Sequence, residues 1–368
     1  MINLSVKNLV KEFAGGSRAV DQINFTVPEG SLFTLLGPSG CGKTTTLRMI
    51  AGLESPTSGQ ILFGDEDYTT FPPHRREIGM VFQSYALFPH MSVYENVAYG
   101  LKIRNVNKTE MRQRVEKVLE LVGLAHTIDR KPSQLSGGQQ QRIALARALV
   151  YEPKILLLDE PLSNLDAKLR VYMREEIRKV QKKAGITTVY VTHDQEEALS
   201  ISDYIAVMHG GRISQLGKSY DIYEKPSSVL VADFIGKANF LDVEIRGNEA
   251  DTFQVALEGS DIRVASAQGE ADSFSQGKQA ILFFRPEKVS LATQPVEGKS
   301  IQCNITHILY LGETVRYTVK LASGKEVNVS LNRRIESLTE GSTGYLVLNA
   351  TDGILFPFEQ KNLLNGGN

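Results

Sequence analysis

The sequence predicts two domains, an α/β domain followed by a small all-β domain. Its 368 residues exceed what one domain usually holds. Up to about residue 236, short apolar runs alternate with helical patterns, as in an α/β domain. After residue 240, apolar residues recur at every second position in short runs, the period of β-strands. We therefore expect domains over 1–235 and 236–368.

Composition excludes several classes of protein. Hydrophobic residues make up 42% and charged residues 23%, which is typical of a globular rather than a disordered chain. The formal net charge is −1, without the basic excess of a nucleic-acid-binding protein, so we expect no nucleic-acid partner. Two distant cysteines, Cys41 and Cys303, indicate a reducing compartment. No apolar run approaches the roughly 18–20 residues needed to cross a membrane, and the first residues lack the pattern of a signal peptide.

The first domain is expected to contain a parallel sheet between helices. Residues 32–37, 154–160 and 187–193 are short and almost continuously apolar, which is typical of parallel strands buried on both faces. Residues 108–124 and 139–151 have the apolar spacing of helices.

The second domain is expected to be a small barrel or sandwich. Its period-two runs are separated by Gly, Ser and Asp, which favour turns. The runs are FLDVEI, TFQVAL, IRVAS, AILFF, SIQCNI, VRYTVKL, EVNVSL, GYLVL and GILF.

Residues 37–44, GPSGCGKT, match the phosphate-loop pattern G-x-x-x-x-G-K-[ST] between a predicted strand and a helical run. Its glycines let the backbone approach phosphates, and the following helix N-terminus attracts their oxygens. Lys43 is placed to contact the β- and γ-phosphates of a nucleotide, and the Thr44 hydroxyl to bind Mg²⁺. We interpret Cys41 as a small filler rather than a reactive thiol. The expected nucleotide-binding residues here are Gly37, Pro38, Ser39, Gly40, Cys41, Gly42, Lys43, Thr44 and Thr45.

Two acids, Asp159 and Glu160, end the apolar run KILLLDE. Adjacent side chains on a strand point to opposite faces, so the two carboxylates are expected to do different work. One can hold Mg²⁺ through water, and the other can orient and deprotonate an attacking water. The alternative is an acidic helix start that follows a strand.

The string LSGGQQQR at 135–142 predicts a second anion site. Ser136 suits a helix N-cap, and Gly137 and Gly138 leave the N–H groups of the helix start uncovered. One nucleotide does not need two such sites on one domain. We therefore expect this loop to serve the ATP of another subunit.

Together these motifs resemble the ATPase subunit of an ATP-binding-cassette importer, a phosphate-loop fold with a helical subdomain. LSGGQ is the signature of that superfamily and lies, as expected, between the phosphate loop and ILLLDE. The resemblance implies that Gln83 touches Mg²⁺ and the attacking water. It implies that Asp166 lies near a dimer interface and that His193 contacts the γ-phosphate. Phe13 stands where the family has an aromatic residue stacked on adenine.

The resemblance also implies a mechanism and partners. Two copies would pair head to tail, with each ATP between Lys43 of one chain and the signature residues Ser136, Gly137, Gly138 and Gln139 of the other. Glu160 would be the general base and Asp159 a Mg²⁺ ligand. Two transmembrane permease subunits would be reached through Gln83 and a helical subdomain at about 85–150, with an extracytoplasmic solute-binding protein acting indirectly. The subunit would lie on the cytoplasmic side of the cell membrane.

The β-rich tail is similar to the oligonucleotide-fold-like (OB-like) accessory domain of maltose-, polyamine-, ferric-iron- and phosphonate-type importer ATPases, through residues 232–242, 284–291 and 308–321. We expect a dimer brace, with a regulatory domain as the alternative. The strings PLSNLDAKLR and DFIGKANFL favour ferric iron as the solute. Polyamine, sugar and phosphonate import stay open, as does a soluble cassette ATPase without a transport role.

Overall fold

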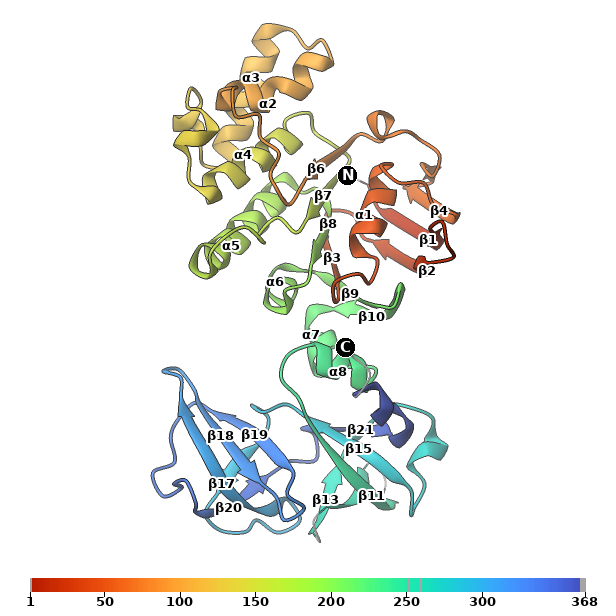
Figure 1. Ribbon diagram of the computed structural model, residues 1–368, viewed down its shortest axis with the longest axis vertical. Helices are drawn as coiled ribbons and strands as arrows, with labels where there is room; N and C mark the ends of the chain where they lie inside the picture. The colour runs from red at the N-terminus through yellow and green to blue at the C-terminus, as the bar shows by residue number, and fades with distance from the viewer. Residues whose placement is uncertain (1, 250–251, 258–259, 365–368) are drawn as a thin grey trace. The chain divides into compact units, whose positions relative to one another are not determined.

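The computed structural model describes residues 2–249, 252–257 and 260–364. The chain forms two compact units, Met1–Glu224 and Lys225–Asn368 (Figure 1). Among these described residues, no helix is long and apolar enough to span a membrane.

The first unit is built on a six-stranded sheet of order β10-β9-β3-β8-β7-β6. All neighbours are parallel except β10, which is antiparallel to β9. The predicted strands are confirmed as β3, β7 and β8, and every residue of these three is buried, as expected for strands covered on both faces. The bounds are β3 Leu32–Leu36, β6 Ile78–Val81, β7 Ile155–Asp159, β8 Thr187–Thr192, β9 Tyr204–His209 and β10 Arg212–Lys218.

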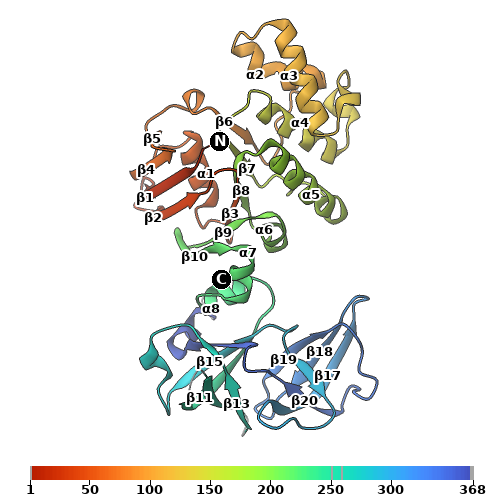
Figure 2. The same cartoon turned by 180° about the vertical axis from the view of Figure 1, so that it is seen from behind.

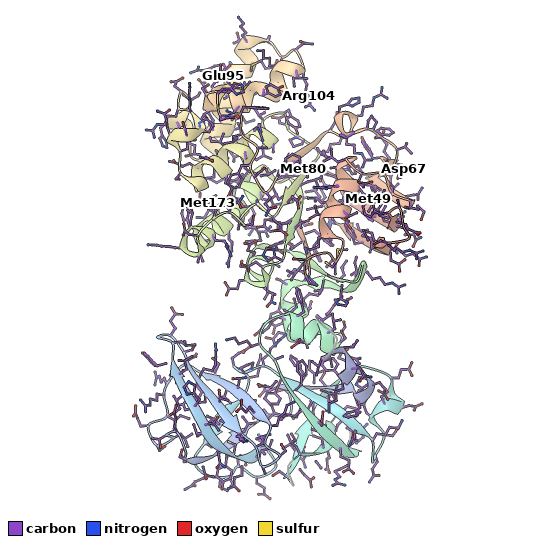
Figure 3. All side chains as sticks on the ribbon, in the orientation of Figure 1. Met49, Asp67, Met80, Glu95, Arg104 and Met173 are labelled. Atoms are coloured by element: carbon purple, nitrogen blue, oxygen red, sulfur yellow. The ribbon has the colours of Figure 1, made fainter. Side chains whose placement is uncertain are left out.

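Helices cover the two faces of this sheet. Helix α1 (Lys43–Ala51) packs with Leu157 on one face, while helices α4 (Gly137–Leu149) and α5 (Ala167–Ala184) pack with Leu156 on the other. Figure 3 shows helices on both faces of the sheet, because the labelled Met49 of α1 and Met173 of α5 lie on opposite sides of it. Successive strand residues therefore enter different cores.

The helical region contains α2 (Val93–Ile103), α3 (Lys108–Leu121) and α4, which pack against one another (Figures 1 and 2). Helix α3 ends at Leu121, two residues before Gly123, whose left-handed φ of 71° stops the helix. Helix α4 starts at Gly137, two residues before the apolar spacing begins, and the predicted N-cap Ser136 is confirmed, because its side chain caps the helix.

A four-stranded antiparallel sheet, β2-β1-β4-β5, completes the first unit and was not anticipated. Register shifts in β1 interrupt its alternation, so its sequence lacks a regular period of two. The bounds are β1 Leu4–Glu12, β2 Arg18–Val27, β4 Ser58–Phe63 and β5 Glu66–Asp67, and two further helices are α6 Gln195–Ile201 and α7 Ser219–Glu224.

The second unit contains two sheets that share one hydrophobic core. One has the order β13-β12-β11-β15-β21-β14 and the other β16-β20-β17-β18-β19. All nine predicted runs form strands, and β14 and β16 are short additions. The proposed boundary after residue 235 follows helix α8 (Val229–Phe234). The strands are β11 Asn239–Glu249, β12 Thr252–Leu257, β13 Ser260–Val264, β14 Ser266–Ala267, β15 Gln279–Phe284, β16 Ser290–Ala292, β17 Ser300–Tyr310, β18 Val315–Lys320, β19 Glu326–Leu331, β20 Thr343–Val347 and β21 Gly353–Pro357.

Candidate nucleotide-binding site

The candidate site lies at the carboxyl ends of four neighbouring parallel strands, the usual position of ligands in open α/β sheets. The phosphate loop follows β3, His193 follows β8, Glu160 follows β7, and Gln83 comes two residues after β6. Because β3, β8, β7 and β6 are adjacent and parallel, these four segments meet at one edge of the sheet.

The glycines of the phosphate loop are needed for different reasons. Gly42 has a φ of 102°, and a Cβ there would collide with the backbone oxygen of Ala19 on β2. Gly37 has an ordinary backbone, but its Cβ would collide with the backbone oxygen of Met208. Gly40 has a φ of 79° and nothing within 4 Å. The loop is therefore shaped by both backbone conformation and close packing.

Lys43 is buried and folds back over its own loop. Its Nζ donates to the backbone oxygens of Gly37 at 2.7 Å and Pro38 at 2.8 Å. Ser39 and Gly40 stay exposed at the rim of the loop. The ammonium group is thus held among loop carbonyls at the start of α1, where a phosphate could replace them as its partner.

Cys41 occupies the inside of the loop, with 4% of its surface exposed. Burial raises the pKa of its thiol, although the Lys43 charge lowers it. A buried neutral thiol is a weak nucleophile, which favours its interpretation as a packing residue.

Thr44 and Asp159 form an oxygen pair beside the loop. The Thr44 hydroxyl donates to Asp159 Oδ1 at 3.3 Å. The pKa of the Asp159 carboxyl is raised overall. Burial is the main cause, the Thr44 hydrogen bond lowers the pKa, and the Glu160 charge raises it. A hydroxyl and a carboxylate are hard oxygen ligands of the kind that Mg²⁺ prefers, so this pair fits the predicted metal.

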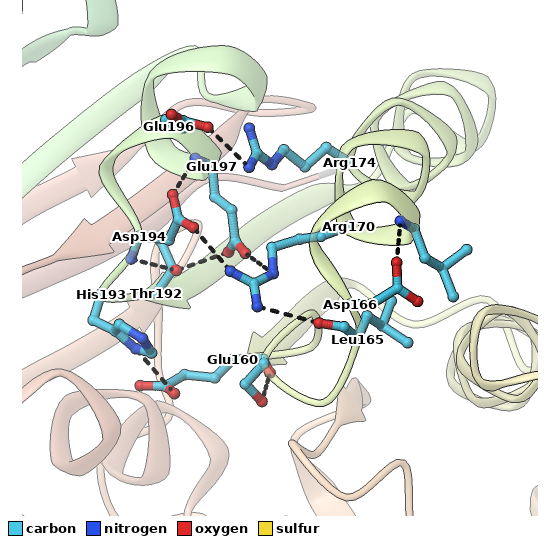
Figure 4. A network of polar contacts seen from close by, with 12 residues as sticks. Glu160, Leu165, Asp166, Arg170, Arg174, Thr192, His193, Asp194, Glu196 and Glu197 are labelled. Atoms are coloured by element: carbon cyan, nitrogen blue, oxygen red, sulfur yellow. Dashed lines mark hydrogen bonds and ion pairs between the residues drawn. The ribbon is translucent and has the colours of Figure 1, made fainter.

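The Glu160 side chain meets His193 (Figure 4). Glu160 Oε2 lies 3.2 Å from His193 Nδ1. The Glu160 backbone has a left-handed φ of 43°, and its N–H donates to the oxygen of Val191 at 3.0 Å. Such strained backbones concentrate at functional sites, where the surrounding structure enforces them. The two acids therefore have different partners, as expected from their adjacency.

The loop after β6 is held by two residues that sequence reasoning missed. Asn164 Nδ2 donates to the backbone oxygen of Gln83 at 2.8 Å. Arg147, on α4, donates to the backbone oxygens of Tyr85 at 2.8 Å and Ala86 at 2.7 Å. Tyr85 and Ala86 both have positive φ. Helix α4 therefore contacts the segment that carries Gln83.

The signature segment starts α4 with a capping box. Ser136 Oγ accepts from the Gln139 N–H at 3.4 Å, and Gln139 Oε1 accepts from the Ser136 N–H at 3.0 Å. Sequence reasoning explained the two glycines by uncovered N–H groups, but they also pack closely. A Cβ at Gly137 would lie 3.2 Å from Leu165, and one at Gly138 would lie 3.2 Å from Leu169.

Phe13 lies in the turn between β1 and β2, and 43% of its surface is exposed. Lys11 Nζ lies 5.0 Å from its ring centroid. Strand β2 also carries Ala19, which touches the phosphate loop at Gly42. The exposed ring therefore belongs to the hairpin that borders the loop, where it can stack on a base.

Asp166 caps α5, because its Oδ1 accepts from the Leu169 N–H at 2.9 Å. Sequence reasoning missed Arg170 in the following turn, which joins Asp194 and Glu197 near His193 (Figure 4). The available signal was a cation in the first turn of a helix, where the helix dipole disfavours positive charge.

Comparisons with known proteins show the family of this chain. Residues 20–163 match the family described as ABC transporter, and residues 282–356 match the family described as TOBE domain. The Fe(3+) ions import ATP-binding protein FbpC of Brucella suis biovar 1 (strain 1330) is 49% identical over 323 residues, 88% of this chain and 89% of that protein. FbpC 1 of Rhizobium meliloti (strain 1021) is 49% identical over 318 residues, 86% of this chain and 88% of that protein.

Two further similarities broaden the comparison. The spermidine/putrescine import ATP-binding protein PotA of Roseobacter denitrificans (strain ATCC 33942 / OCh 114) is 46% identical over 327 residues, 89% of each chain. The solved structure of cbiO1 from Clostridium perfringens, described as part of the ABC transporter complex cbiONQ, is 33% identical. It superimposes with a TM-score of 0.56 and covers 60% of this chain and 89% of that one.

Proposed function

This chain belongs to the ATP-binding-cassette family as the ATPase subunit of an import system, and we propose that the imported solute is ferric iron. The subunit binds ATP, couples its hydrolysis to import and works with membrane permease subunits. The observation that carries the iron proposal is the 49% identity to ferric-iron import ATPases over more than four fifths of the chain. The 46% identity to PotA makes a polyamine the second candidate.

We further propose that the active form is a head-to-tail homodimer. The phosphate loop leads into α1 on one face of the central sheet, whereas the signature helix α4 packs on the other face. Ser136 at the start of α4 is exposed. One chain can thus offer its signature segment to the ATP of its partner, while its own ATP sits on its phosphate loop.

Within each site, the chain's own residues divide the work. The backbone N–H groups of residues 37–44 and the Lys43 ammonium bind the phosphates, and Phe13 stacks on the base. Thr44, Asp159 and Gln83 are the residues that would hold Mg²⁺, which when bound neutralises phosphate charge. The raised pKa of Asp159 indicates a desolvated carboxylate that gains from a nearby cation.

Glu160 is the proposed general base. Its carboxylate accepts a proton from the attacking water and orients that water toward the γ-phosphorus. His193, 3.2 Å from Glu160, steadies the carboxylate and contacts the γ-phosphate. The Glu160 backbone is left-handed where the chain leaves β7, and the side chain of Glu160 meets His193 there.

We propose that the conformational change caused by ATP binding and hydrolysis reaches the permease subunits through the segment after β6. The Gln83 backbone is tied to Asn164, and the next turn is tied to Arg147 on α4. Movement at the nucleotide can therefore pass to the helical region, about 85–150, without a separate domain. We place the subunit peripherally on the cytoplasmic side of the membrane, with a solute-binding protein acting indirectly from the other side.

Glu160→Gln tests the mechanism and the dimer together. The variant should bind ATP, lose turnover and elute as an ATP-dependent dimer in gel filtration, because the general base is gone while the binding groups remain. A variant that stays monomeric with ATP would contradict the dimer. A variant that keeps natural turnover would contradict the role of Glu160.

Uptake identifies the solute. Source cells that carry Glu160→Gln in place of the natural chain should lose uptake of ferric iron and keep uptake of spermidine, maltose and a phosphonate. Selective loss of spermidine uptake would instead establish the polyamine alternative and contradict the iron proposal.

A further inference from the structure

Arg170 stands in the first turn of α5, where the backbone N–H of Arg170 donates to the oxygen of Asp166 at 2.9 Å. A cation at a helix N-terminus is disfavoured by the helix dipole. The acidic N-cap of α5, Asp166, accepts from the Leu169 N–H, and no described contact joins its carboxylate to the Arg170 guanidinium. The guanidinium therefore depends on groups outside its own helix.

Those groups come from two loops of the nucleotide site (Figure 4). Arg170 Nη2 donates to the backbone oxygen of Leu165 at 3.2 Å. Arg170 Nη1 donates to Asp194 Oδ2 at 3.3 Å. Arg170 Nε lies 3.9 Å from Glu197 Oε1. A planar guanidinium fork can donate to the Leu165 and Asp194 acceptors at once, while Glu197 lies within ion-pair distance.

The two loops carry residues of the proposed reaction. Leu165 directly precedes Asp166 and is buried, and its side chain would lie 3.2 Å from a Cβ at Gly137. Asp194 directly follows His193, and its N–H is fixed by the Thr192 hydroxyl at 2.9 Å. One side chain thus joins the segment beside the signature helix to the segment that carries His193.

Glu197 anchors this arrangement. It is buried, and its Oε2 accepts from the hydroxyls of Thr192 at 2.7 Å and Tyr190 at 2.9 Å. Burial raises the pKa of Glu197, and the hydrogen bonds from Thr192 and Tyr190 lower it. A buried carboxylate held by two strand hydroxyls provides a rigid negative charge beside the Arg170 guanidinium, which donates to both loops.

We propose that Arg170 is a positioning residue that holds His193 in register with the loop 163–166. The inference rests on the proposed role of His193 at the γ-phosphate. Arg170 is nowhere placed against the nucleotide, so its loss should slow turnover without weakening ATP binding. It acts through the Asp194 carboxylate on one side and the Leu165 carbonyl on the other.

Arg174, one turn further along α5, provides a matched control. Its Nη2 pairs with Glu196 on α6 at 3.3 Å, and that carboxylate is largely exposed. It therefore links the same two helices, but none of its recorded contacts reaches Leu165 or Asp194. Arg174→Met tests the loss of an α5–α6 ion pair while the Arg170 contacts with Leu165 and Asp194 remain.

The experiment compares Arg170→Met, Arg170→Lys and Arg174→Met in the full chain. We expect Arg170→Met to lower kcat by about 10- to 100-fold, the scale of a small misplacement of reacting groups, with little change in KM for ATP. Arg170→Lys should recover only part of the loss, because one ammonium keeps the charge but not the fork. Arg174→Met should stay close to the natural chain.

A second readout follows His193 directly. The chain has six histidines, so their imidazole signals can be resolved by NMR and assigned with His193→Gln. Arg170→Met should shift the His193 signal, and Arg174→Met should not. An unshifted signal, unchanged kcat in Arg170→Met, or equal loss in both Met variants overturns the proposal. If Arg170→Met does not fold, Arg170→Lys carries the same test. Absence of turnover in the natural chain would instead count against the proposed catalytic roles, and the NMR comparison would still decide the positioning role.

Discussion

Replacing Gly42 with alanine should destabilise the first unit more than the same change elsewhere in the phosphate loop. Gly42 has a left-handed φ of 102°, which costs an L-residue about 1–2 kcal/mol. Its new Cβ would also collide with the Ala19 carbonyl and lie 3.3 Å from Val20 Cγ2. Forced shifts of this kind cost about 1–3 kcal/mol. The total loss is therefore about 2–5 kcal/mol of the free energy of unfolding.

Two neighbouring glycines separate these contributions. Gly40 has a φ of 79° with nothing within 4 Å, so Gly40→Ala should lose only the conformational part, about 1–2 kcal/mol. Gly37 has an ordinary φ but a blocked Cβ position, so Gly37→Ala should lose only the packing part, about 1–3 kcal/mol. The entropy that alanine removes from the unfolded chain is the same in all three variants and cancels in the comparison.

Urea unfolding of the full chain, without nucleotide, measures these losses. Far-ultraviolet circular dichroism reports mainly on the first unit, because helices α1 to α7 all lie there. If Gly42→Ala is no less stable than Gly40→Ala, the contact between the phosphate loop and β2 does not hold Gly42 as described. That result would refute the reasoning.

Three further predictions concern the same site. Asp159→Asn should gain stability relative to the natural chain as pH rises above about 4, because burial raises the pKa of Asp159. With a raised pKa, the native natural protein binds more protons than its unfolded chain, so its free energy of unfolding falls as the Asp159 carboxyl ionises, whereas asparagine has no proton to lose. Urea midpoints of both proteins over a pH series check this, and a difference between their midpoints that does not change with pH would contradict it. Cys41 should alkylate more slowly than a free thiol, because it is buried with a raised pKa, and more slowly still with ATP. Peptide mass spectrometry measures both rates, and equal rates with and without ATP would place Cys41 away from the nucleotide. Phe13→Ala should weaken ATP binding by about 1–3 kcal/mol, roughly 5- to 150-fold in Kd, while Phe13→Tyr keeps it; an unchanged Kd on titration would remove the stacking role.

Much of the fold follows from local patterns. The three buried strands of the parallel sheet and all nine period-two runs were predicted because burial on two faces and on one face leave different sequence periods. The antiparallel sheet of the first unit was missed, because register shifts in β1 break its period. Apolar spacing by itself left helix ends two or three residues off, and the predicted cap at Ser136 and the left-handed Gly123 mark where these helices start and end.

The residues proposed to act on the nucleotide could be predicted from the sequence, but the residues that position their loops could not. The phosphate loop, Asp159 and Glu160 lie in contiguous strings whose composition reflects phosphate and metal chemistry. Asn164, Arg147 and Arg170 make their contacts across 81, 61 and 24 positions of sequence. Nothing local marks such partners, apart from the unfavourable place of Arg170 at a helix start.

The sequence by itself determined which motifs are present, their order, and the change from an α/β domain to a β-rich one, because these depend on residue type and short-range periodicity. Only the tertiary structure decided that Glu160 faces His193 while Asp159 faces Thr44. It also decided that Gly137 packs against Leu165 and Gly138 against α5, and that Arg170 joins two loops. These features depend on a left-handed backbone, on close contacts and on strand order. Each arises only when segments distant in the chain are brought together by burial of the shared core.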